Sequence, residues 1–257
     1  MTSEQRRDFI YNYLHQHNEV SFKKLSSLLN TSHMTIRRDS KILEEEGKVT
    51  PIFGGIKLNN ILKLELSYRE KAELNTDIKR KLGICCSSLI ESGQTIYLDA
   101  GTTLFNVAKQ IAKSPYLNLT VITNDFTICN YLIDMPHITL YHTGGLVNSR
   151  NYSCMGNSAA NFFNLINIDI AFLSSSSWDL KRGMSTPDEG KSSVKKAVIK
   201  ASRRKVLVSD SSKFGKYGLF HICDLNQLTD IVTDNQLLKD DQQKIIEQSI
   251  ALHLIKD

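Results

Sequence analysis

The chain has 257 residues, of which 41% are hydrophobic, a proportion that can bury an ordinary core and excludes a wholly disordered protein. Its net charge of +5, from 32 basic and 27 acidic residues, is compatible with a nucleic-acid partner but does not require one. The five cysteines lack zinc-ligand spacing, so we expect no metal, and we expect no cofactor. No apolar stretch is long enough to span a bilayer, so we expect no signal peptide, no membrane partner and a cytoplasmic location.

The first predicted elements are three short helices within residues 4–46. Ser21 is expected to cap the second helix and Ser32 the third, because a serine oxygen accepts hydrogen bonds from free N–H groups at a helix start. Gly47 is expected to end the third helix. Two short apolar runs within residues 48–56 then predict a small hairpin, which would form the wing of a winged helix-turn-helix.

The third helix combines a hydrophobic back with a short basic front. At 100° per residue, Leu43 returns to the direction of Ile36 while Arg38 points to the opposite side. Such a face suits the major groove of DNA, although a solvated basic face on an ordinary helix is the alternative. The expected contacts to a double-stranded DNA operator are Ser32, Met34, Thr35, Arg37, Arg38 and Lys41.

Residues 58–75 mix charge with leucine and are interpreted as a partly helical linker. From residue 76 onward, β-branched runs alternate with amphipathic stretches, a pattern typical of a doubly wound, mostly parallel α/β sheet with helices on both faces. The expected domains are therefore residues 1–57, which would bind DNA, and residues 76–257. The predicted strands are Thr95–Asp99, Thr120–Thr123, Ile138–His142, Ile168–Leu173, Lys205–Asp210 and Asp230–Thr233, and the predicted helices are Ile78–Ile90, Leu104–Lys113, Ser193–Ala201 and Asp240–Leu254.

Polar residues follow several of these strands, at the edge where parallel sheets bind ligands. Gly101 permits close backbone approach, and Thr102 and Thr103 offer hydroxyls at a helix N-terminus, which together suit a phosphate. An ordinary strand-to-helix turn is the alternative. Lys213 follows a later strand and can add a positive charge, unless it is only an exposed surface lysine.

Several strings in both halves of the chain resemble the DeoR family. They are TIRRD at 35–39, Gly54–Gly55, LDAGTT at 98–103, VITND at 121–125, HTGG at 142–145, SCMGNSA at 153–159 and SDSSKFG at 209–215. The resemblance implies a winged helix-turn-helix followed by a sensor domain similar in fold to ribose-5-phosphate isomerase. It implies a repressor of a carbohydrate operon, forming a homodimer or homotetramer, that a phosphorylated sugar releases from DNA. The expected effector residues are Asp99, Gly101, Thr102, Thr103, Asn124, Gly144 and Lys213.

Two positions depart from the family pattern. Ser40 stands where the family usually carries leucine, which places a hydroxyl on the inward stripe of the third helix and is expected to weaken its packing. Residues 174–178, four serines and a tryptophan, stand where the family usually has glycine, so the effector pocket is expected to be reshaped.

A second basic cluster, comprising Lys195, Lys196, Lys200 and residues 203–205, is interpreted as a solvated helix face, with an oligomer contact as the alternative. We expect no catalysis, because no hydrolase or metalloprotease motif is present. Two rival functions remain at this point. One is a sugar-phosphate isomerase or deaminase that carries a DNA-binding module, and the other is a transcriptional activator or a regulator without a small-molecule effector.

Overall fold

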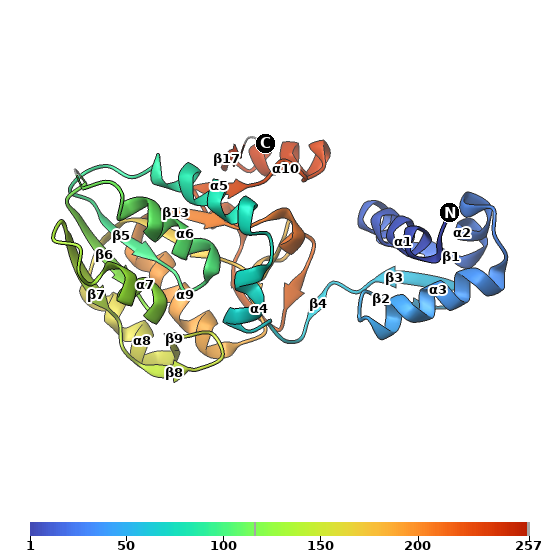
Figure 1. The fold of residues 1–257 in the computed structure, drawn as a ribbon, viewed down its shortest axis with the longest axis horizontal. Helices are drawn as coiled ribbons and strands as arrows, with labels where there is room; N and C mark the ends of the chain where they lie inside the picture. Colours follow the sequence, from blue (N-terminus) through green and yellow to red (C-terminus); the bar gives the residue numbers. More distant parts are fainter. Residues whose placement is uncertain (116, 256–257) are drawn as a thin grey trace. The chain divides into compact units, whose positions relative to one another are not determined.

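The computed structural model describes residues 1–115 and 117–255, and the chain divides into two compact units, Met1–Ile61 and Leu62–Asp257. Each unit has hydrophobic residues buried in a core of its own. Figure 1 shows the elements of both units along the chain.

The first unit contains three helices and a three-stranded antiparallel sheet of strand order β1-β3-β2. Serines cap two of the helices, as expected from the sequence: Ser21 accepts from the Lys24 N–H at 3.2 Å and Ser32 from the Thr35 N–H at 3.2 Å. Ile10, Leu25 and Ile36 are fully buried between the helices. The elements are α1 (Ser3–His17), β1 (Glu19–Ser21), α2 (Phe22–Leu29), α3 (His33–Glu45), β2 (Val49–Ile52) and β3 (Gly55–Leu58).

The wing depends on two adjacent glycines. Gly54 has a φ of +73°, in the left-handed region that favours glycine, and it turns β2 into β3. A Cβ on Gly55 would lie 2.2 Å from the carbonyl oxygen of Val20, so only glycine lets β3 approach β1 this closely. The predicted hairpin wing is therefore confirmed, and it gains a third strand that the sequence did not indicate.

The second unit begins with a short strand and a short helix and continues as alternating strands and helices. Three 3₁₀ turns, η1 (Phe163–Leu165), η2 (Ser211–Lys213) and η3 (Leu225–Gln227), complete it. The helices are α4 (Tyr68–Glu73), α5 (Thr76–Ser87), α6 (Thr102–Ile111), α7 (Phe126–Leu132), α8 (Gly156–Phe162), α9 (Glu189–Ala201) and α10 (Lys239–Glu247). The strands are β4 (Ile61–Leu62, at the boundary), β5 (Thr95–Leu98), β6 (Leu119–Thr123), β7 (Ile138–His142), β8 (Leu146–Asn148), β9 (Ser153–Met155), β10 (Ile168–Ser174), β11 (Ser177–Asp179), β12 (Gly183–Thr186), β13 (Ser202–Val208), β14 (Tyr217–Gly218), β15 (Phe220–Cys223), β16 (Asp230–Thr233) and β17 (Ala251–Leu254).

Seven strands form one parallel sheet of order β17-β16-β13-β10-β5-β6-β7. Alternate residues of β5 and β10 enter two separate cores, as the two-residue period of a strand requires. One core contains residues of α5, α6 and α7, and the other contains residues of α8, α9 and α10. The chain runs from β5 to β6 and β7, then returns to β10 on the other side of β5. The predicted doubly wound sheet is confirmed, and its switch point lies between β5 and β10.

Two expectations about this unit are wrong. The predicted helix Asp240–Leu254 ends at Glu247, because Ser249 adopts a φ of +62° and residues 251–254 pair as an edge strand with β16. The second basic cluster is not simply a solvated face. Lys195 is buried and pairs with Asp99, while Arg204 forms two hydrogen bonds with Asp230, at 2.9 and 2.6 Å.

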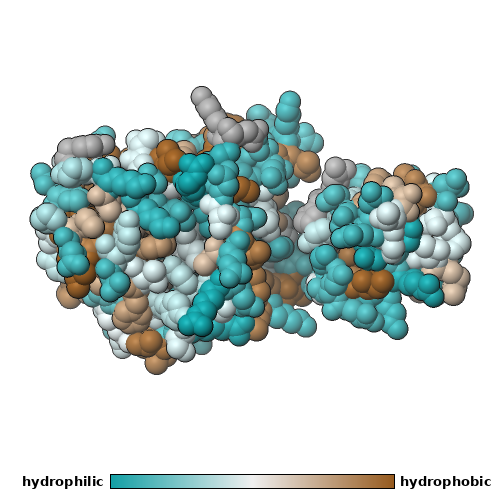
Figure 2. Space-filling view, viewed as in Figure 1, coloured by the Kyte–Doolittle hydropathy of each residue, from teal (hydrophilic) through white to brown (hydrophobic). Residues whose placement is uncertain are grey.

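Hydrophilic residues cover most of the visible surface of both units, and hydrophobic residues form small, separated areas on it (Figure 2). Among the described residues, no helix has the length and apolar character that crossing a membrane requires.

Candidate ligand pocket and nucleic-acid-binding helix

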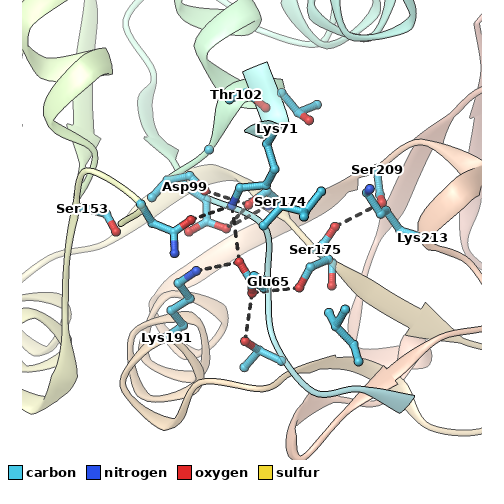
Figure 3. Close-up of a pocket in the computed structure, with 18 of the residues that line it drawn as sticks. Glu65, Lys71, Asp99, Thr102, Ser153, Ser174, Ser175, Lys191, Ser209 and Lys213 are labelled. Carbon is cyan, nitrogen blue, oxygen red and sulfur yellow. Dashed lines mark hydrogen bonds and ion pairs between the residues drawn. The ribbon is translucent and has the colours of Figure 1, made fainter. Parts of the chain in front are cut away.

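A cavity of about 200 Å³ opens at the carboxyl edge of the parallel sheet in the second unit. Asp99 follows β5, Ser174 ends β10 and Ser209 follows β13, so three neighbouring strands deliver polar residues to the same place. This is the switch point of the sheet, where α/β folds bind ligands. Figure 3 shows these side chains around the cavity.

The start of α6 forms one wall of this cavity. Gly101 is the N-cap, with a φ of +143°; its own N–H donates to the Asp125 carboxylate at 3.0 Å, and no described side chain accepts from the N–H groups of Thr102 and Thr103. The backbone N–H groups of Thr102 and Thr103 are therefore available to a ligand, and the helix dipole favours a negative charge there. Lys213, which forms no ion pair with any described residue, lines the same cavity. This wall has the properties of a phosphate site.

Two of the expected effector residues serve mainly to build the cavity. Asp99 is buried, and its carboxylate accepts hydrogen bonds from the Ser174 N–H and hydroxyl, both at 2.9 Å, and from the Lys195 ammonium group. Asn124 accepts from the Tyr97 hydroxyl at 2.8 Å and donates to the carbonyl of Cys154 at 2.8 Å. Their polar atoms are thus committed to protein partners, which fixes the ends of β5 and β6.

The structure brings together six of the seven expected effector residues. Gly144 is the exception: it is not among the lining residues, and its N–H donates to Nδ1 of His142 at 3.1 Å. Three of the four serines at 174–177 line the cavity, namely Ser174, Ser175 and Ser176. Figure 3 shows Ser174 and Ser175 beside it, and their hydroxyls donate to the Asp99 carboxylate and to the Ser177 carbonyl. The six lining residues are Asp99, Gly101, Thr102, Thr103, Asn124 and Lys213.

Of the residues that set the charge of the cavity, the sequence indicated Asp99 and Lys213 as effector residues but not the others. Six lysines and three carboxylates line it, which leaves three positive charges when all are ionised. Lys195 had been assigned to a solvated face, and Glu65 and Lys71 to a linker. No sequence signal marks these residues, because their partners lie up to 126 positions away in the chain. The lysines are Lys71, Lys79, Lys191, Lys195, Lys213 and Lys216, and the carboxylates are Glu65, Asp99 and Asp210.

Glu65 forms ion pairs with two of these lysines. One of its oxygens accepts from Nζ of Lys191 at 2.6 Å and of Lys71 at 3.4 Å. Burial raises the pKa of Glu65, but the charges of Lys191 and Lys71 outweigh it and bring this pKa to about 2. Burial lowers the pKa of Lys71 to about 8, against the opposing effect of Glu65. Glu65 is therefore ionised at neutral pH.

In the first unit, α3 presents its basic side chains to solvent. Met34, Arg37, Arg38 and Lys41 are exposed, whereas Ile36 is fully buried. The back of the helix is fixed by Asp39, which is 1% exposed and accepts from Nε of Arg6 at 2.8 Å. Ser40 is buried on the same side, and its hydroxyl has no hydrogen-bond partner among the described residues.

The two units define a class of protein in which a winged helix-turn-helix is joined to an α/β domain with an anion-accepting pocket. Comparisons with protein families agree with this class. Residues 6–61 match the DeoR-like helix-turn-helix domain, and residues 74–235 match the DeoR C terminal sensor domain. The chain belongs to the DeoR family of transcriptional regulators.

Individual relatives extend over nearly the whole chain. An uncharacterized HTH-type transcriptional regulator of Haemophilus influenzae is 42% identical over 255 residues, covering 99% of this chain and 98% of the relative. A putative aga operon transcriptional repressor of Escherichia coli O157:H7 is 30% identical over 256 residues, covering 99% of this chain and 94% of the relative. Among solved structures, ribose 5-phosphate isomerase A of Methanocaldococcus jannaschii matches with a TM-score of 0.41 and 18% identity over 55% of each chain.

Proposed function

We propose that the chain is a DNA-binding repressor of a carbohydrate-catabolism operon, and that a phosphorylated sugar or sugar derivative releases it from its operator. The observation that carries this proposal is the lysine-rich pocket beside the uncapped start of α6, in the same chain as a basic recognition helix. A helix N-terminus with nearby cations suits a phosphate, and the many serine and threonine hydroxyls of the pocket suit the hydroxyls of a sugar.

On the DNA side, α3 enters the major groove with its exposed basic face. Arg37, Arg38 and Lys41 contact base edges or phosphates, Met34 and Thr35 lie at the groove wall, and Ser32 presents the helix start to the backbone. The expected assembly is a homodimer or homotetramer, because two recognition helices related by symmetry match an operator with two half-sites.

The effector acts by a population shift between an assembly that fits the operator and one that does not. Its effect on DNA affinity equals the difference between its affinities for these two states. Catalysis is not part of the proposal. The three carboxylates of the pocket are each engaged: Glu65 by lysines, Asp99 by Lys195, and Asp210 by the Ser212 hydroxyl and the Asn75 amide.

Substitution of one recognition-helix arginine tests the division of labour. We expect Arg38→Ala to abolish binding to a promoter fragment from the protein's own locus, measured by fluorescence anisotropy, and to leave effector binding intact in calorimetry. Arg203→Ala is the matched control, because it removes an exposed arginine from the second unit and is expected to keep operator affinity. Equal loss of DNA and effector binding in Arg38→Ala would contradict the modular function.

A turnover assay separates the repressor from the enzyme alternative. The full chain is incubated with aldose phosphates, and the products are followed by NMR. We expect no conversion above the uncatalysed rate. Conversion that disappears in Lys213→Ala would favour a sugar-phosphate isomerase instead.

A further inference from the structure

Glu65 occupies a complete anion site inside the pocket. Its second oxygen accepts from the Ser176 hydroxyl at 2.8 Å and the Thr186 hydroxyl at 3.3 Å, in addition to the two lysines on the first oxygen. Figure 3 shows this carboxylate at the centre of the cavity, with donors on several sides. Two cations and two hydroxyls directed at two oxygens match the acceptor capacity of one carboxylate.

This site is separate from the wall formed by α6. The four donors to Glu65 come from α4, β12, α9 and the loop after β10, whereas the phosphate-accepting wall comes from α6 and Lys213. The pocket therefore offers places for two different anionic groups. A sugar whose only anionic group is one phosphate would occupy the α6 wall and leave Glu65 bound at its own site.

The size and charge of the cavity are compatible with a ligand that takes the place of the Glu65 carboxylate. Its size of about 200 Å³ is below the roughly 300–1,000 Å³ that is common for ligand pockets, and residues of the 62–75 segment form part of its lining. Once the Glu65 carboxylate leaves, six lysines face two carboxylates, an excess of four positive charges. A phosphate of about −1.5 to −2 together with one carboxylate leaves the same residual positive charge as a phosphate alone beside Glu65, so the exchange of one carboxylate for another keeps the charge balance of the pocket.

We propose that the site around Glu65 is a carboxylate subsite, and that the effector is a phosphorylated sugar acid whose carboxylate displaces Glu65 from Lys71 and Lys191. This proposal rests on the proposed function and specifies its ligand. Glu65 follows Ile61, the last residue of the first unit, by four positions. Displacement thus loosens the segment that leads directly out of the DNA-binding unit, and it gives the effector a route to that unit.

Matched ligand pairs test the proposal on the full-length protein. The probes are 6-phosphogluconate against glucose 6-phosphate, and 4-phosphoerythronate against erythrose 4-phosphate, which differ within each pair by a carboxylate at C1. We expect calorimetry to show at least tenfold tighter binding of the acid in one pair or both. Lys191→Met is expected to remove this preference, because it removes the shorter of the two lysine contacts.

Two variants of the same segment separate displacement from a general charge effect. Glu65→Gln removes the competing charge and is expected to tighten binding of the preferred acid by about tenfold or more. Glu73→Gln removes an exposed carboxylate of α4 and is expected to stay within about twofold of the unaltered chain. Weaker or unchanged binding in a folded Glu65→Gln variant would overturn the proposal.

Hydrogen exchange provides a readout that needs no variant. Addition of the preferred acid is expected to speed amide exchange in residues 62–74 while slowing exchange at the start of α6. Slower exchange in both segments would overturn displacement. If aldose phosphates bind and release DNA as well as the acids do, the proposed function stands and the carboxylate subsite is wrong. If no member of either pair binds, the carboxylate subsite is also wrong. If phosphorylated sugars in general leave DNA binding unchanged, the proposed function itself is wrong.

Discussion

Single residues in this chain depart from the rule that buried polar groups are paired. The Ser40 hydroxyl is buried in the helix-turn-helix without a hydrogen-bond partner among the described residues. Leaving a buried hydroxyl unpaired costs about 1–3 kcal/mol. The sequence predicted this cost from the position of Ser40 on the inward stripe, and the structure confirms that the residue is buried there.

Ser40→Ala is therefore expected to stabilise the first unit by about 1 kcal/mol, because alanine removes the unpaired hydroxyl and favours the helix. Calorimetry of the full chain measures the change as a higher Tm. Ser26→Ala is the matched control: its hydroxyl donates to the Thr31 carbonyl at 2.6 Å, so the same substitution is expected to lower the Tm. A lower Tm in Ser40→Ala would show that the hydroxyl is satisfied in solution.

Lys71 is expected to make the affinity of the pocket for an anionic effector depend on pH between pH 7 and pH 9. Burial lowers the pKa of Lys71 to about 8, so this lysine is mainly charged at pH 7 and mainly neutral at pH 9. An anionic effector binds the charged form more tightly. We expect the affinity for a phosphorylated effector to fall by up to roughly tenfold between pH 7 and pH 9, since one pKa unit corresponds to about 1.4 kcal/mol.

Calorimetry at several pH values across this range measures the decrease. The effector's phosphate is already ionised above pH 7, so it does not produce a fall in affinity in this window. Lys71→Met is expected to bind more weakly at pH 7 and to lose most of the dependence. An affinity in the unaltered chain that is constant from pH 7 to pH 9 would contradict the role of Lys71.

Among the elements, α1 and α3 are joined by ion pairs to the buried Asp39, a close one from Arg6 and a longer one from Arg7 at 3.9 Å. Asp39 is 1% exposed, and it accepts from Nε of Arg6 at 2.8 Å and from the Ser3 hydroxyl at 3.1 Å. Arg6 thereby holds the recognition helix against the first helix of the unit. Removing one partner of a buried pair leaves the other charge uncompensated, which costs about 3–5 kcal/mol.

Arg6→Ala is accordingly expected to destabilise the first unit by up to about 3 kcal/mol, since Arg7 keeps only the longer contact with Asp39, and to weaken operator binding, because α3 loses its fixed orientation. Chemical unfolding of the full chain and anisotropy with operator DNA measure the two effects. The control is Arg80→Ala, whose partner Asp77 is exposed, so a change below about 0.5 kcal/mol is expected. Equal effects of the two variants would show that the Asp39 pair is as weak as a surface pair.

Elements formed by contacts between residues near one another in the chain could be predicted from the sequence, and elements formed by contacts between distant residues could not. Local patterns sufficed for the six predicted strands of the sheet and for the caps of α2 and α3. They failed for residues 251–254, where pairing with β16 decides the structure and helical spacing does not. They also failed for β11, β12 and β15, which form a small antiparallel sheet with three residue pairs in each of its two pairings.

The candidate site shows the same division. Gly101, Thr102 and Thr103 were found because a phosphate-accepting helix start is a local signal. Lys195 was assigned to a solvated face because nothing near it in the chain indicates Asp99, which is 96 positions away. Glu65 was missed for the same reason, since its partner hydroxyls belong to residues more than 100 positions further on.

In the whole molecule, the proposed function requires that occupancy of the pocket and affinity for DNA are coupled. Coupling between two binding sites is reciprocal, so DNA must change the affinity for the effector by the same factor as the effector changes the affinity for DNA. A typical coupling of 1–3 kcal/mol corresponds to a factor of about 5–150. The sequence indicates both sites but not this factor, because it depends on the difference between two states of the assembly.

The most direct test measures effector affinity twice by calorimetry on the full chain, once free and once saturated with a promoter duplex from its own locus. We predict weaker effector binding to the DNA-bound protein, by the same factor of about five or more by which the effector lowers DNA affinity in anisotropy. Identical effector affinities in the two measurements would contradict the claim that the pocket controls DNA binding.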